Sequence, residues 1–113
     1  MDKKELVANF SQELRRGTLI LCVLANLKEP TYGYSLIEKL SKTGISIEAN
    51  TLYPLLRRLE GQELLASTWN TDGAKPRKYY DLTDFGCEVL GELKKHWQGT
   101  VQSMNEILEV SEL

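Results

Sequence analysis

The chain has 113 residues, of which 42% are hydrophobic and 27% charged, the composition of a globular domain and not of a disordered tail. This length predicts one domain and excludes most large catalytic architectures. Two cysteines, Cys22 and Cys87, are too few and too far apart for a disulfide framework, so we expect a reducing, cytoplasmic environment. We expect no export signal and no membrane span, because the longest uncharged stretch, residues 17–27, is shorter than the ~20 residues that a span needs.

Charge is unevenly divided along the chain, although the net charge is only -2. In residues 49–80 five basic side chains outnumber three acidic ones, whereas in residues 84–113 six acidic side chains outnumber two basic ones. A basic middle indicates a surface for an anion such as nucleic acid. Charge blocks are also common on solvated surfaces, so the pattern alone leaves both interpretations open.

Apolar periodicity predicts two helices in the N-terminal part of the chain. The first spans residues 4–27 and ends before Pro30, which cannot continue a helix. The second spans residues 31–44, with Thr31 as its N-terminal cap and Gly44 in the left-handed conformation after its end.

A third, amphipathic helix is predicted in residues 49–65, with Pro54 near its first turn, where a missing N–H does least harm. Residues 64–71 and 77–83 are short runs rich in Thr, Trp and Tyr, which favour strands. The turn-forming sequence DGAKP separates them. Together they predict a β-hairpin with a basic tip.

A long helix is predicted in residues 84–113, with Thr83 as its cap. A helix of about 25 residues is about 38 Å long, which is more than a three-helix core of this size can cover. Part of its apolar face therefore needs a second chain, and we expect a homodimer; the alternative is a helix lying along its own domain. The apolar face consists of Leu90, Leu93, Trp97, Val101, Met104 and Leu108.

This order of elements predicts a mainly α fold with a small β-hairpin: a winged helix-turn-helix in residues 1–83, whose first helix also contributes to dimerisation, and a long C-terminal dimerisation helix in residues 84–113 that is not an independent domain. The third helix would enter the DNA major groove, and the hairpin, or wing, would reach the backbone. Asn50 and Thr51 suit base edges, and Arg57 suits phosphate or guanine. The predicted DNA-binding residues are Tyr34, Asn50, Thr51, Tyr53, Arg57, Lys75, Arg77 and Lys78.

Four stretches between Leu14 and about Leu108 resemble the PadR-like transcriptional regulators: LILCVLANL, TYGYSLIEKL, ANTLYPLLRRLE and KPRKYYDLTDFG. The chain is similar to the short members with one C-terminal helix. The resemblance implies a dimeric repressor that binds a pseudo-palindromic double-stranded operator. The chain departs from the family pattern at Glu63, where glycine is usual, so either Gly61 ends the helix early or Glu63 adopts the left-handed conformation.

The resemblance also implies an effector site, because Trp97 matches a tryptophan that, in multidrug-sensing members, stacks with its dimer mate around planar aromatic compounds. Lys94, one turn before Trp97, would repel a cationic compound. The alternative, that Trp97 only fills the dimer seam, stays open. The implied ligand-binding residues are Ser11, Leu14, Thr18, Lys94, Trp97, Val101 and Met104.

Catalysis, metal binding and a cofactor are not predicted. His96 is the only histidine, and the sequence places no catalytic cysteine or carboxylate pair beside it. Cys22 lies in an apolar run and is expected to be inert, whereas Cys87 is expected to be more exposed. The remaining alternative to a DNA-binding regulator is a winged-helix module that docks a protein.

Overall fold

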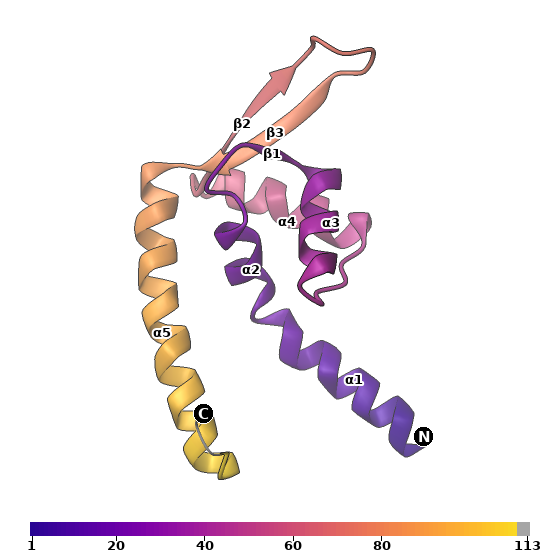
Figure 1. The fold of residues 1–113 in the computed structure, drawn as a ribbon, viewed down its shortest axis with the longest axis vertical. Coiled ribbons are helices and arrows are strands. Elements are labelled where there is room, and N and C mark those ends of the chain that lie inside the picture. Colours follow the sequence, from indigo (N-terminus) through magenta and orange to yellow (C-terminus); the bar gives the residue numbers. More distant parts are fainter. Residues whose placement is uncertain (111–113) are drawn as a thin grey trace.

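The computed structural model describes residues 1–110, and these form five helices and one three-stranded antiparallel sheet (Figure 1). The predicted mainly α architecture with a small β element is confirmed. Residues 111–113, which the sequence prediction included in the last helix, lie outside the described residues. The elements are α1 (Lys3–Arg16), α2 (Leu19–Ala25), β1 (Thr31–Tyr32), α3 (Gly33–Lys42), α4 (Ala49–Gly61), β2 (Leu65–Asn70), β3 (Arg77–Leu82) and α5 (Asp84–Leu108).

The prediction of one helix over residues 4–27 is wrong, because the helix is interrupted between α1 and α2. Gly17 is a poor helix former, and Thr18 follows it. The backbone N–H and the hydroxyl of Thr18 both donate to the Arg15 carbonyl, at 3.0 and 2.9 Å. These local hydrogen bonds compete with the helical ladder and end α1.

The hydrophobic core lies between α2, α3, α4, the base of the sheet and the first turns of α5. Helix α1 contributes no buried residue to it. Leu90, in the second turn of α5, is buried in the same cluster, so the last helix is anchored to the body of the molecule. The largest fully buried side chains are Leu24, Leu27, Leu36, Leu40, Leu52, Leu56 and Leu59.

The sheet has a third strand that the sequence did not predict. Thr31 and Tyr32 pair with Tyr80 and Tyr79, which places β3 at the centre of the order β1-β3-β2. The prediction that Thr31 caps α3 is therefore wrong, since Tyr32 occupies the cap position. The Thr31 hydroxyl instead donates to the Glu29 carbonyl at 3.0 Å. A strand of two residues is too short to show the alternation by which strands are recognised.

Helix α4 begins at Ala49, so Pro54 is its sixth residue and lies in the second turn, just beyond the first turn near which the sequence predicts it. The missing N–H leaves the Asn50 carbonyl without its usual partner, but Asn50 is exposed and water can take that place. After the helix ends at Gly61, Glu63 adopts φ 66°, the left-handed conformation that was one of the two expected outcomes. Gly44 has φ 85°, as predicted.

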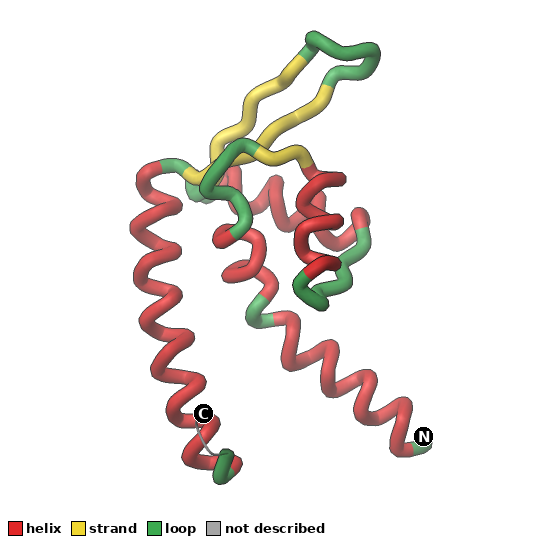
Figure 2. Tube along the Cα trace, in the orientation of Figure 1, coloured by secondary structure: helices red, strands yellow, loops and turns green. Residues whose placement is uncertain are grey.

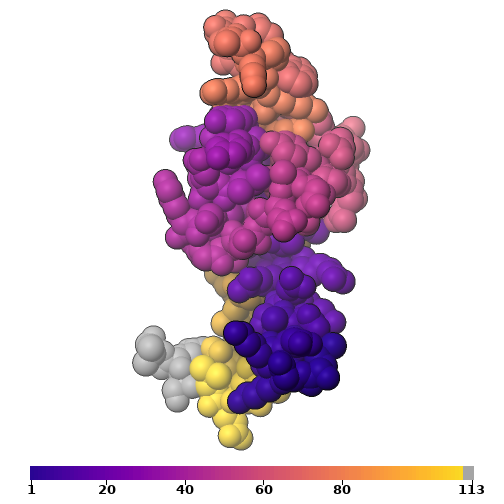
Figure 3. All heavy atoms as spheres, turned by 90° about the vertical axis from the view of Figure 1, so that its right-hand side faces the viewer, coloured from indigo at the N-terminus to yellow at the C-terminus, as the bar shows by residue number. Residues whose placement is uncertain are grey.

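The molecule is elongated, with principal extents of 52 × 35 × 26 Å. In Figure 2 the N-terminus and the end of α5 lie at one end of the molecule, where α1 and the second half of α5 leave the body and diverge from each other. The β2–β3 hairpin projects from the opposite end, and the space-filling view in Figure 3 shows it standing clear of the helices. The fold thus separates a hairpin end from an end formed by two exposed helices.

Candidate nucleic-acid interface

Helices α3 and α4 form a helix-turn-helix whose contact is made by buried leucines, and α4 presents its other face to solvent. Asn50 and Thr51 lie in the first turn of α4 and are both exposed. The N–H groups at the start of a helix and its dipole favour an approaching anion such as phosphate. Arg57, two turns further along α4, is also exposed. Four of the predicted DNA-binding residues, these three and Tyr53, thus lie on one accessible helix.

Tyr53 is held against the start of α3. A methyl group added at Gly33 would lie only 2.5 Å from the Tyr53 ring, so glycine is what allows this close approach. Tyr34 follows directly and is exposed. The fold therefore brings Tyr34 and Tyr53, which are distant in sequence, to the same corner of the helix-turn-helix.

The wing, defined as β2, β3 and the turn 71–76 between them, carries Lys75 in its turn and Arg77 at the first position of β3. The Arg77 guanidinium lies 4.9 Å from the centre of the Tyr32 ring, a cation–π contact. The Tyr32 ring in turn packs on Tyr79, with ring centres 5.6 Å apart. This aromatic pair orients Arg77 at the base of the wing turn, a role of Tyr32 that sequence reasoning missed.

Lys78 lies on the opposite face of β3 from Arg77. Its ammonium is 3.3 Å from Glu60 Oε1 at the end of α4 and 5.1 Å from the centre of the Tyr80 ring. The structure therefore does not bring Lys78 together with Lys75 and Arg77. The sequence contained a signal for this orientation: residues two apart on a strand point to the same face, so Lys78 lies on the face of the buried Tyr80.

The seven residues implied for an effector site do not form one site within a single chain. Thr18 and Trp97 line the same hollow of about 340 Å³ between α2, α4 and α5. Four polar side chains that sequence reasoning missed also line it: Arg58, Gln62, His96 and Thr100. Arg58 thus faces this hollow, in contrast to Arg57 on the exposed face of α4.

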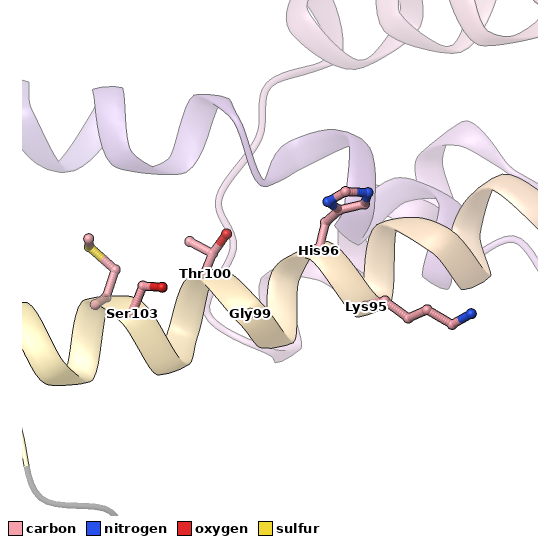
Figure 4. Close-up of a pocket in the computed structure, with 6 residues that line it drawn as sticks. Lys95, His96, Gly99, Thr100 and Ser103 are labelled. Atoms are coloured by element: carbon pink, nitrogen blue, oxygen red, sulfur yellow. The ribbon is translucent and has the colours of Figure 1, made fainter.

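A second hollow of about 510 Å³ lies along α5 itself and includes Met104 (Figure 4). The close-up shows His96 and Thr100 projecting from α5 on the side of the N-terminal helices, whereas Lys95 points away. Ser11 and Val101 are half-buried, and Leu14 and Lys94 are exposed.

Residues 1–110 contain no group of three or more His, Cys, Asp or Glu side chains arranged to hold a metal ion. Within the same residues, no helix is both long and apolar enough to cross a membrane. Both cysteines are free thiols: Cys22 is half-buried and Cys87 is exposed.

A helix-turn-helix followed by a projecting two-stranded wing defines the winged-helix class of proteins. Within this class, the model of the transcriptional regulator PadR-like family matches residues 20–102. The chain therefore belongs to the PadR-like family, and this confirms the resemblance drawn from the sequence.

Solved structures agree with this assignment. The chain is 51% identical to a PadR family transcriptional regulator from Eggerthella lenta, with a TM-score of 0.89 and 96% of each chain covered. It is 33% identical to a PadR-like transcriptional regulator from Bacillus cereus, with a TM-score of 0.78 over 88% of this chain and 99% of the other. Among curated proteins, it is 32% identical over 82 residues to the transcriptional regulator Rv3488 of Mycobacterium tuberculosis, covering 72% of this chain and 77% of that protein.

Proposed function

We propose that this chain is a sequence-specific DNA-binding repressor that acts in the cytoplasm as a homodimer on a pseudo-palindromic operator. The observation that carries the proposal is the joint exposure of Asn50 and Thr51 on the first turn of α4, in a fold whose projecting wing carries Lys75 and Arg77. Such a helix can enter the major groove while the wing reaches the backbone. Two copies related by a two-fold axis would read half-sites about 34 Å apart on one face of the duplex.

Dimerisation is supported by the apolar faces of α1 and α5. On α1, Leu6, Phe10 and Leu14 recur every four residues and are 43%, 59% and 78% exposed. On α5, Trp97 and Met104 are exposed as well. Apolar faces of this kind usually mark an interface. We propose that α5, with the help of α1, is the dimerisation element, attached to a DNA-binding unit in residues 1–83.

An effector at the dimer interface is the second part of the proposal. Trp97 is 44% exposed and lines a hollow that also contacts α4, so an occupant could alter how the recognition helix is held. A planar aromatic compound would stack on the indole ring. A compound that quenches Trp97 fluorescence and leaves the DNA affinity unchanged would remove this part of the proposal.

The test of DNA binding compares the affinity for DNA from upstream of the gene with that for scrambled DNA at several salt concentrations. We expect Arg77→Glu to weaken binding to both DNAs about tenfold and to lower the salt slope by about 1 for each lost phosphate contact. Asn50→Ala should instead reduce the preference for the operator, because it removes a base contact. Lys95→Glu, on α5 far from the wing, is the control for an equal change in net charge.

The alternative is a winged-helix module that docks a protein. In that case Arg77→Glu and Asn50→Ala would change neither the weak, salt-dependent binding to DNA nor its sequence preference, and the proposal of a repressor would be abandoned.

A further inference from the structure

A single carboxylate connects the recognition helix α4 to both strands of the wing. Glu60 lies in the last turn of α4, one residue before its end. Its Oε2 accepts a hydrogen bond from the Ser67 hydroxyl on β2, and its Oε1 is 3.3 Å from the Lys78 ammonium on β3. We call Glu60, Ser67 and Lys78 the wing clamp.

The wing clamp lies where the hairpin leaves the body of the molecule. Tyr80, which pairs with Ser67 across the hairpin, and Leu65 are buried in the core. Trp69, which pairs with Lys78, is 61% exposed, and residues 70–76 beyond it are also exposed. Figure 3 shows that this outer part of the hairpin is not covered by the helices. The angle between the wing and α4 therefore depends on contacts near this point.

The electrostatics of the clamp agree with its geometry. The Ser67 hydrogen bond holds the pKa of the Glu60 carboxyl below its ordinary 4.5, against the effect of partial burial, and the Lys78 ammonium adds to this lowering. The carboxylate is therefore ionised at neutral pH and can accept both bonds. Because the side chains of Lys78 and Glu60 are 30% and 32% exposed, the pair contributes little to global stability.

We infer that Glu60 is a positioning residue for DNA binding: it fixes the wing relative to the recognition helix, and Lys78 serves as its partner in the clamp and not as a phosphate contact. This inference rests on the proposed function. Its physical basis is that one carboxylate on α4, a helix buried in the core along its length, bridges to two strands that the core contacts only at their inner ends. A wing held at one angle does not lose the freedom of a loose hairpin on binding, so the clamp lowers the entropic cost of binding.

The experiment compares Glu60→Gln, Lys78→Met and the double variant in DNA affinity, salt slope and amide hydrogen exchange. We expect each single variant to weaken operator binding about fivefold, with an unchanged salt slope, and to accelerate exchange in residues 68–77 while the melting temperature stays close to that of the parent. The double variant should be no weaker than either single one, because both remove the same link. Glu92→Gln, which breaks a pair with Lys95 within α5, is the matched control.

The swapped variant, Glu60→Lys with Lys78→Glu, restores the ion pair and should recover most of the affinity. If Lys78→Met instead lowers the salt slope by about 1 while Glu60→Gln binds like the parent, Lys78 is a phosphate contact and the inference is overturned. Unchanged exchange in residues 68–77 of Glu60→Gln would also overturn it. If the parent binds no DNA, the proposed function fails, and the exchange comparison still tests the clamp by itself.

Discussion

Glu63 shows how one residue determines where the wing begins. It follows α4 with φ 66°, a conformation in which a β-carbon is crowded and which glycine adopts without cost. The next residue, Leu64, donates its N–H to the Leu59 carbonyl at 3.0 Å and turns the chain toward β2. The turn is thus made in the geometry that glycine would supply, although glycine is absent.

We expect Glu63→Gly to raise the free energy of unfolding by about 0.5–1 kcal/mol, because it removes the crowding at the left-handed residue. Gln62→Gly is the control: Gln62 has φ -89°, so glycine there should only add flexibility and lower stability. Urea denaturation of the three proteins measures both effects. A lower stability of Glu63→Gly would show that the Glu63 side chain itself stabilises the turn.

The first turn of helix α5 is bound to the loop that follows α4. Thr83 accepts the Gly86 N–H at 2.9 Å and donates its hydroxyl to the Glu63 carbonyl at 2.7 Å, so the cap also binds the loop after α4. A methyl group at Gly86 would lie 2.1 Å from the Leu64 carbonyl oxygen. The close approach of helix and loop therefore requires glycine at this position.

We expect Gly86→Ala to lower the free energy of unfolding by about 3 kcal/mol, because backbone atoms must move apart to admit the methyl group. Gly91→Ala is the matched control on the same helix, where a β-carbon would meet nothing within 4 Å. It should gain up to about 1 kcal/mol from the higher helix propensity of alanine. Thermal unfolding followed by circular dichroism distinguishes the two, and equal effects at both glycines would contradict the tight contact at Gly86.

At the scale of the whole molecule, the exposed helices at one end and the wing at the other divide the proposed functions between two ends (Figure 1). Helix α1 buries no residue in the core, so its apolar face does not stabilise the fold of a single chain by packing. An amphipathic helix that is not packed on its own domain gains its stability from a partner.

We expect Phe10→Ala to raise the dissociation constant of the dimer at least about 30-fold, because a large aromatic side chain at an interface commonly contributes about 2 kcal/mol or more. Gln12→Ala, on the opposite side of α1, should leave the dimer unchanged. Sedimentation velocity over a range of concentrations measures both. If Phe10→Ala associates as tightly as the parent, α1 lies outside the interface.

Periodicity, turn chemistry and motif spacing in the sequence were sufficient to predict the helical core, the β2–β3 hairpin, the cap at Thr83 and a long last helix, which ends at Leu108 and not at residue 113. These features depend on residues close together in the chain, and such local preferences can be read without a structure. The motifs also identified the family, because the sequences of α4 and β3 contain motifs that are specific to the PadR-like regulators.

Only the tertiary structure decided which surface residues meet. The pairing of β1 with β3, the contact of Tyr53 with Gly33 and the link from Glu60 to the wing all join segments that are separate in sequence. Lys78 shows what the sequence leaves undecided. Its charge predicts a basic wing, but its position on β3 directs it toward Glu60 at the end of α4. A charge in sequence gives the sign of a surface, but the packing of helices and strands determines which partner it faces.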